Sequence, residues 1–270
     1  MQELQKVVVD PNAAPEKIAG GFAFTEGPVF SRRGYLLFSD IPPNRIMRWS
    51  RGAVTVFREK SNGTNGLTFD HQGRLLACET GRVTRTEKDG KITTLAQQGL
   101  HNPNDLVYSI DGSIYFSDLL PRGAAGKSLV YQITRAGELR VANDECDRPN
   151  GVALSPNQQK LYVADSGARN VRVFDIAGDG ALRTGRIFAD LKSDQPGAPD
   201  GLKTDESGNV WVAAASGVWV FSAKGEHVGT VQTPEPPSNC NWGEGFRSLY
   251  ITARTSVYKV QTKVNGTRTF

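Results

Sequence analysis

The fold follows from the stretch Asn150-Gly151-Val152-Ala153-Leu154, which a short polar segment separates from Leu161-Tyr162-Val163-Ala164-Asp165. A polar lead residue, a small residue and two short apolar strands therefore make one unit. The unit recurs along the chain, and the last copy is the weakest match. The lead residues of the six copies are 39, 39, 46, 50 and 39 positions apart, and they are Glu26, Asn65, Asn104, Asn150, Asp200 and Asn239.

A repeat of this length is typical of a four-stranded propeller blade. Each copy is followed by a third apolar strand, such as Val171-Arg172-Val173-Phe174, and then by a turn and a short fourth strand. No amphipathic helix of useful length appears, which argues against α/β folds. The sequence therefore predicts an all-β, six-bladed β-propeller with a central metal site, formed by residues 1–270 as a single domain.

Three further expectations concern the ring and its loops. The first and last blades should share strands, and the candidates are Val7-Val8-Val9 and Val257-Tyr258-Lys259-Val260. The longer third and fourth copies should hold their extra residues in loops at Pro121–Lys127 and Ser193–Pro199. Insertions of this kind usually cap a binding face.

Composition excludes several classes of protein. The net charge of +4 comes from scattered Lys and Arg residues, so a nucleic-acid partner is not expected. No segment is long and apolar enough to span a membrane, and residues 1–10 lack the layout of a signal peptide. We expect a cytoplasmic monomer or weak dimer, or a periplasmic protein if a signal peptide has been removed. Cys78, Cys146 and Cys240 are expected to be free, buried thiols.

The chemistry of the lead positions is unusual. In a propeller the innermost strands line a central channel, so their first residues should converge at one mouth of it. All six leads carry oxygen donors, which suit Ca²⁺ or Mg²⁺. Zn²⁺ is disfavoured as the native ion because the chain has only three histidines, at unrelated repeat positions. The alternative interpretation is that Asn-Gly and Asp-Gly are simply turn dipeptides.

The same stretches resemble the SMP-30/gluconolactonase/luciferin-regenerating-enzyme family, often called regucalcin-like. The similarity runs from about residue 18 to 264 and is carried by Thr25-Glu26-Gly27-Pro28-Val29, Asn102-Pro103-Asn104-Asp105-Leu106, Arg148-Pro149-Asn150-Gly151-Val152 and Pro199-Asp200-Gly201-Leu202. The resemblance implies one divalent cation, in the first place Ca²⁺, with Zn²⁺, Mn²⁺ or Mg²⁺ as replacements in vitro. It implies that Glu26, Asn150 and Asp200 are metal ligands, with Asn104 as a fourth ligand or a substrate contact.

Two departures from the family bear on the substrate. Asn102 stands where some members carry a substrate-binding Arg, and Thr80 stands where many bacterial members carry a His. His101 lies three residues before Asn104, so His101, Asn102 and Asn104 are the predicted substrate-binding residues. A surface role for His101 is the alternative.

The resemblance implies hydrolysis of a small sugar lactone. In the predicted mechanism the cation polarises the lactone carbonyl and Asp200 activates water, with Glu26 as the alternative base. No Gly-x-Ser-x-Gly motif occurs, which disfavours a serine nucleophile. Three other functions are retained: a phosphotriester hydrolase that uses the same metal ring, a non-enzymatic binding propeller, and a metal-independent propeller similar to strictosidine synthase.

Overall fold

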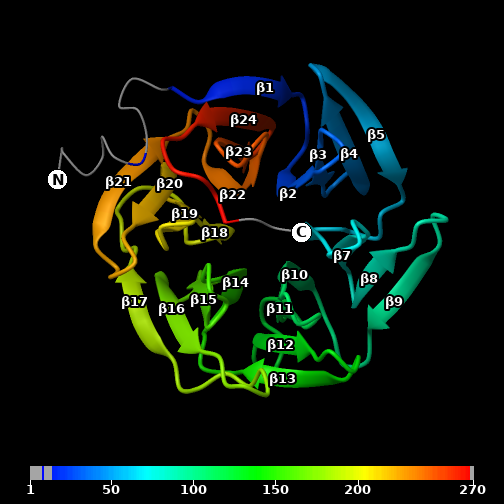
Figure 1. Cartoon of the computed structure of the whole chain (residues 1–270), viewed down its shortest axis with the longest axis vertical. Helices are drawn as coiled ribbons and strands as arrows, with labels where there is room; N and C mark the ends of the chain where they lie inside the picture. Colours follow the sequence, from blue (N-terminus) through cyan, green and yellow to red (C-terminus); the bar gives the residue numbers. More distant parts are fainter. Residues whose placement is uncertain (1–7, 9–13, 268–270) are drawn as a thin grey trace.

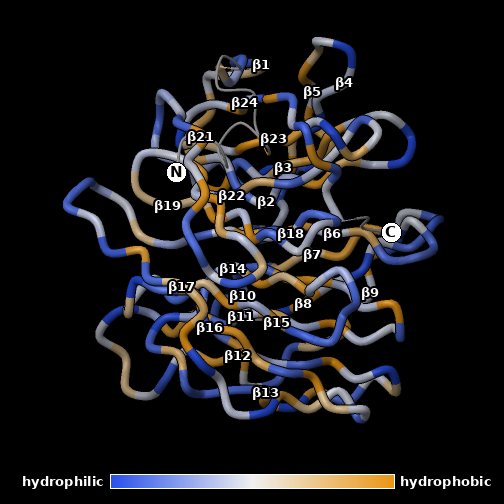
Figure 2. Tube along the Cα trace, turned by 60° about the vertical axis from the view of Figure 1, so that its left-hand side comes forward, coloured by the Kyte–Doolittle hydropathy of each residue, from blue (hydrophilic) through white to orange (hydrophobic). Residues whose placement is uncertain are grey.

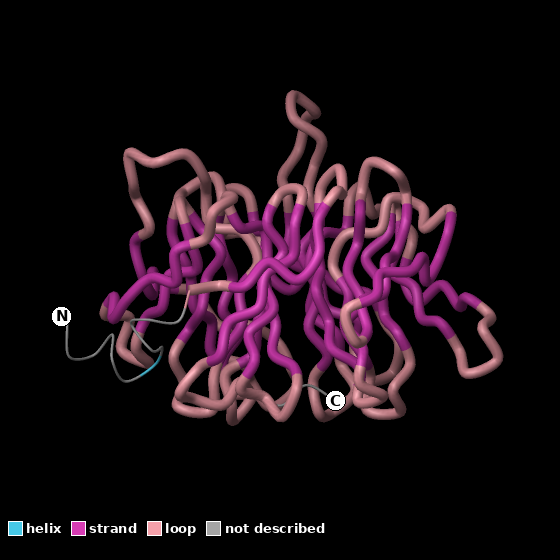
Figure 3. Tube along the Cα trace, turned by 90° about the horizontal axis from the view of Figure 1, so that it is seen from above, coloured by secondary structure: helices cyan, strands magenta, loops and turns pink. Residues whose placement is uncertain are grey.

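The computed structural model describes residue 8 and residues 14–267, and it confirms the six-bladed propeller. Six four-stranded antiparallel sheets surround a central axis (Figure 1). Residues 14–267 contain no helix, and hence none that is long and apolar enough to cross a membrane. Seen from the side, the strands form one layer and the loops gather at its two faces (Figure 3).

The strands of each blade follow one another from the central axis to the rim. From the innermost to the outermost, the first three blades are β2 (Thr25–Ser31), β3 (Tyr35–Asp40), β4 (Arg45–Ser50) and β5 (Ala53–Glu59); β6 (Leu67–Phe69), β7 (Leu75–Glu79), β8 (Arg82–Thr86) and β9 (Ile92–Ala96); and β10 (Pro103–Tyr108), β11 (Ile114–Asp118), β12 (Leu129–Ile133) and β13 (Leu139–Asn143). The last three are β14 (Pro149–Leu154), β15 (Lys160–Asp165), β16 (Asn170–Asp175) and β17 (Arg186–Asp190); β18 (Leu202–Thr204), β19 (Val210–Ala214), β20 (Gly217–Phe221) and β21 (His227–Gln232); and β22 (Pro237–Gly243), β23 (Ser248–Ala253), β24 (Ser256–Gln261) and β1 (Glu16–Gly20).

The sixth blade closes the ring with a strand from the other end of the chain. The prediction for residues 257–260 is confirmed, because they lie in β24 and pair with β1. The prediction that Val7-Val8-Val9 forms the partner strand is wrong: the partner is β1, which begins at Glu16. Ile18 and Ala19 of β1 pack against the apolar cluster between the first and sixth blades. This packing stabilises β1 as the strand that closes the ring. Val7 and Val9 themselves lie outside the described residues.

Apolar side chains fill the spaces between neighbouring blades, and the strands carry most of the hydrophobic stretches (Figure 2). Trp211 of the fifth blade and Trp242 of the sixth are buried and meet edge to face, with ring centroids 5.1 Å apart. The three cysteines are free and buried, as predicted. Edge-to-face aromatic pairs and apolar burial stabilise the contacts between blades.

The glycines after the lead residues allow the inner strands to approach closely. A Cβ at Gly151 would lie 2.4 Å from Asp200 O, and one at Gly66 would lie 2.6 Å from Asn104 O. Gly66 and Gly151 have ordinary negative φ angles, so they are not turn glycines. The interpretation of these dipeptides as simple turns is therefore wrong: the glycine is needed where the next blade comes close.

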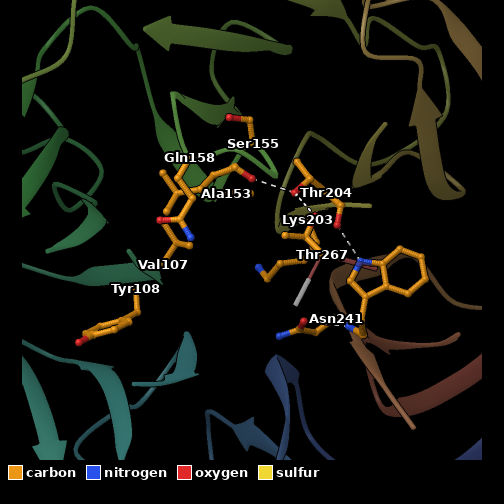
Figure 4. Close-up of a pocket in the computed structure, with 11 residues that line it drawn as sticks. Val107, Tyr108, Ala153, Ser155, Gln158, Lys203, Thr204, Asn241 and Thr267 are labelled. Carbon is orange, nitrogen blue, oxygen red and sulfur yellow. Dashed lines mark hydrogen bonds between the residues drawn. The ribbon is translucent and has the colours of Figure 1, made fainter. Parts of the chain in front are cut away.

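The C-terminal segment covers the far end of the channel. Thr267 N donates to Thr204 O at 3.0 Å, and Gly266 packs on the Trp242 ring. Beneath this segment lies a small cavity of about 40 Å³, into which Lys203 and Asn241 point (Figure 4). We call this end of the channel the floor, and the end at which the lead residues lie the mouth.

Candidate active site

The lead residues stand at or just before the start of the inner strands, so they gather at the mouth. Glu26 and Asn239 are buried, whereas the other four leads are partly exposed. Glu26 Oε2 accepts hydrogen bonds from Gly27 N at 2.6 Å and from Asn239 Nδ2 at 3.0 Å. Two leads from opposite ends of the sequence are thus directly joined.

Two acids at the mouth, Glu26 and Asp200, have pKa values above their ordinary range. Burial, and then the charge of Asp105, raises the pKa of Glu26 to about 7, although the Gly27 and Asn239 hydrogen bonds oppose the shift. Burial, followed by the charges of Glu26 and Asp105, raises the pKa of Asp200 well above its ordinary range. Neither Glu26 nor Asp200 forms an ion pair with a Lys, Arg or His of the described residues. Carboxylates in such surroundings favour a proton or a cation.

An amide oxygen at the mouth also lacks a partner. Asn150 Nδ2 donates to Ser166 Oγ at 3.1 Å, and Ser166 Oγ donates to Pro199 O at 2.6 Å, which fixes the amide. The opposite atom, Asn150 Oδ1, is buried without a hydrogen-bond donor from the described residues, and the same is true of Asn65 Oδ1. A buried, unsatisfied oxygen is costly unless something outside the chain binds it.

These donors fit a hard cation. No group of three His, Cys, Asp or Glu side chains comes together within the described part of the chain, so a metal ion held at the mouth has to use amide oxygens as well. Glu26, Asp200 and the free Asn150 oxygen offer two carboxylates and one amide, a donor set that Ca²⁺ accepts and Zn²⁺ disfavours.

A cavity of about 490 Å³ opens beside Asn150 and Asp200. Both predicted loop insertions contribute to its wall, through Arg122 from the first and Ala198-Pro199 from the second. The expectation that these residues form loops is confirmed, and that they cap a binding face stays a prediction. A cavity of this volume is large enough for a small sugar derivative.

The predicted substrate residues belong to the third blade, which supplies Leu119 and Arg122 to the cavity wall. His101 N donates to both oxygens of the buried Asp118 at 3.1 Å, and His101 Nδ1 lies 3.4 Å from Asp118 Oδ2, while the ring is half exposed. Burial raises the pKa of Asp118, and the His101 contacts oppose the rise. Asn102 Nδ2 donates to Leu119 O at 3.3 Å. Neither these residues nor Asn104 lines the cavity, so their substrate role stays a prediction.

Sequence reasoning missed four polar residues of the cavity wall: Arg122, Asp147, Arg148 and Ser166. A signal for two of them was present. Asp165 accepts hydrogen bonds from the backbone N–H groups of residues 147 and 148, at 2.8 and 2.9 Å, as Asp118 does for residue 101. Asp147-Arg148 therefore occupies, in the fourth blade, the position that His101-Asn102 has in the third.

A second missed feature is an ion pair inside the channel. Asp105 stands where four other blades have glycine, and its carboxylate is buried. Lys203 Nζ lies 3.5 Å from Asp105 Oδ2 and donates to Leu202 O at 2.9 Å. Asp105 also accepts hydrogen bonds from Leu106 N and Val152 N. The pair joins the third, fourth and fifth blades across the channel.

Comparison with known proteins agrees with this architecture. The model of the SMP-30/gluconolactonase/LRE-like region matches residues 24–255, which include all six lead residues. The chain belongs to this family. Within the family, the gluconolactonase of Zymomonas mobilis is 29% identical over 96% of this chain and 84% of its own length.

Solved structures of the family superpose closely. A gluconolactonase of Xanthomonas campestris, described as important in glucose secondary metabolic pathways, has a TM-score of 0.85 and is 31% identical, covering 93% of this chain and 90% of its own. Regucalcin from Agrobacterium tumefaciens, described as a calcium-binding protein, has a TM-score of 0.83 over 96% of each chain. It is only 16% identical, so it supports the fold alone.

Proposed function

We propose that this protein is a metal-dependent hydrolase of sugar lactones. The observation that carries the proposal is that two acids without a direct ion pair and an amide oxygen without a hydrogen-bond donor stand at the mouth, next to a cavity of about 490 Å³. Relatives named gluconolactonase that align over nearly the whole chain support the reaction class.

In the proposed site Glu26, Asn150 and Asp200 hold one divalent cation, with Asn104 in or beside the ligand set. Ca²⁺ fits best because all these donors are oxygens and none is His or Cys. When bound, the cation supplies Lewis acidity toward the lactone carbonyl oxygen. Asn239 holds Glu26 in place through its 3.0 Å hydrogen bond, and Ser166 holds Asn150.

Asp200 is the proposed general base. It is the one carboxylate of the leads that lines the cavity, so it can reach a water molecule beside the substrate. The carboxylate takes a proton as the water oxygen adds to the carbonyl carbon. Asp200 then returns this proton to the ring oxygen as the carbon–oxygen bond breaks, which gives the open hydroxy acid and restores the carboxylate. Glu26 is buried and does not line the cavity, which makes it the less suitable base.

The test is proton release from gluconolactone and related sugar lactones by the Ca²⁺-loaded protein, followed with a pH indicator and corrected for spontaneous hydrolysis. Turnover that disappears with a chelator and returns with Ca²⁺ supports the proposal. The phosphotriester hypothesis replaces it if the loaded protein cleaves phosphotriesters and no lactone. Lactone turnover that survives full removal of metal contradicts the metal-dependent mechanism.

A further inference from the structure

Two arginines line the cavity beside Asp200. Arg148 stands at the entrance to β14, and Arg122 comes from the loop between β11 and β12. Neither guanidinium lies within 4.0 Å of a carboxylate of the described residues. The cavity thus contains two cationic groups whose charge the chain itself does not neutralise by a direct ion pair.

Arg148 is held in position while most of its donors stay free. Its backbone N–H is bound by Asp165 Oδ1 at 2.9 Å, and Pro149 follows it directly and restricts the backbone. One guanidinium nitrogen, Nη1, donates to Leu120 O at 3.4 Å, and the side chain is half buried. The remaining N–H groups have no partner within residues 14–267. A pre-oriented guanidinium fork suits a carboxylate or phosphate.

The two acids of the cavity wall, Asp147 and Asp200, make no direct ion pair with the arginines within the described residues. The Asp147 carboxylate packs against Gly167 and makes no ion pair with either arginine. Asp200 belongs to the lead residues and faces the proposed cation site. Apart from Asp200, the cavity wall therefore carries two arginines and one carboxylate, that of Asp147.

We propose that Arg148, assisted by Arg122, selects lactones whose end remote from the reacting carbonyl carries an anionic group, either a carboxylate or a phosphate. The inference rests on the proposed lactonase function and names the substrate class of the same site. In this proposal Arg148 is a specificity residue: it binds the part of the substrate that does not react. Arg122, on an exposed loop, adds a second and weaker contact.

The experiment compares three lactones: neutral gluconolactone, glucarolactone with a remote carboxylate, and phosphogluconolactone with a remote phosphate. Values of kcat/KM are measured for the wild type and for R148Q, R148K and R122Q. The matched control is R135Q, which removes an exposed arginine from the turn after β12, at the face opposite the mouth. The acidic lactone with the higher kcat/KM shows whether the remote group that the protein binds is a carboxylate or a phosphate.

We expect the wild type to prefer at least one acidic lactone by about tenfold or more. R148Q should lower kcat/KM for that lactone by about 10- to 100-fold, the usual worth of a charge-assisted hydrogen bond, and change the value for gluconolactone less than about threefold. R148K should keep part of the preference, R122Q should lose less than R148Q, and R135Q should match the wild type. A wild type without the preference, or an R148Q variant that slows all three lactones equally, overturns the inference.

If no lactone is hydrolysed, the proposed function fails, and the charge preference is then decided by binding. Calorimetry with gluconate, glucarate and phosphogluconate gives the affinities of the Ca²⁺-loaded protein. The cationic subsite is supported if the wild type binds glucarate or phosphogluconate more tightly than gluconate and R148Q loses this preference. Equal affinities in the wild type and R148Q overturn it.

Discussion

The two ends of the channel differ in how their buried charges are compensated. Deeper in the channel, Lys203 is paired with the buried Asp105, and Lys203 lines the cavity of about 40 Å³ beneath the C-terminal segment. At the mouth, Glu26 and Asp200 have no such partner among the described residues, and the cavity beside them measures about 490 Å³. Deeper in the channel, the chain itself neutralises the buried charge. The mouth leaves acids and amide oxygens for a cation and a substrate from outside.

Replacing the proposed base at the mouth should produce the largest of the expected effects, and this effect should be a loss of catalysis. Asp200→Asn keeps an oxygen donor of nearly the same shape but removes the basic oxygen. We expect kcat for lactones to fall by about 10²–10⁴-fold, the usual contribution of a general base. Metal content, measured by elemental analysis, should persist. Asp194→Asn, in the loop that precedes Asp200, is the control and should keep full activity. Full activity in Asp200→Asn would show that another group is the base.

Removing the lysine near the floor should affect stability instead. Lys203→Met leaves Asp105 buried without its cation, which should cost about 3–5 kcal/mol of unfolding free energy. Urea denaturation measures the loss, and the exposed Lys224→Met is the control. The double variant D105N/K203M should recover most of the stability, because it removes both charges. If Lys203→Met is as stable as the wild type, the pair does not hold the channel together.

The fold was predictable from the sequence because each blade repeats the same strand pattern around a lead residue. The closing strand was not, because Val7-Val8-Val9 and Glu16–Gly20 can both form strands and only packing against β24 distinguishes them. Among the site residues, the lead oxygens were visible as a repeated position. Arg148 and Arg122 were not, because a cavity wall depends on how two loops fold over the mouth. The Asp105–Lys203 pair joins residues 98 positions apart, which no local pattern reveals.

The stability of the metal-free protein should depend on pH through Glu26 at the mouth. Glu26 has an ordinary pKa of 4.5 and a folded pKa of about 7, so the folded protein binds the proton more tightly than the unfolded chain. Stability of the metal-free protein should therefore fall as pH rises from about 4.5 to about 7, by roughly 2–3 kcal/mol. Thermal melts in a chelator measure this, and Glu26→Gln should weaken the dependence. A metal-free protein that gains stability over this range would contradict the assignment.

A small change at the floor should leave catalysis untouched. The Thr204 hydroxyl donates to Leu154 O at 2.8 Å beneath the C-terminal segment (Figure 4). The same hydroxyl also hydrogen-bonds the Thr267 hydroxyl at 3.0 Å. Thr204→Val removes both hydrogen bonds at nearly constant volume and should cost about 0.5–1.5 kcal/mol for each. The melting temperature should fall by a few degrees relative to the exposed control Thr55→Val, with unchanged kcat/KM. A large loss of activity in the folded variant would mean that the floor takes part in the reaction.

The central claim is that the mouth is completed by one cation that lactone hydrolysis requires. The most direct measurement is a Ca²⁺ titration of chelator-treated protein in which lactone hydrolysis and melting temperature are followed together. We predict that lactone hydrolysis rises from the metal-free value and saturates once one Ca²⁺ is bound per chain. The melting temperature should rise from the metal-free value and keep rising with free Ca²⁺, with stabilisation of about 2.7 kcal/mol when free Ca²⁺ is about 100 times Kd. Full lactone turnover by protein shown by elemental analysis to be free of metal would contradict the claim.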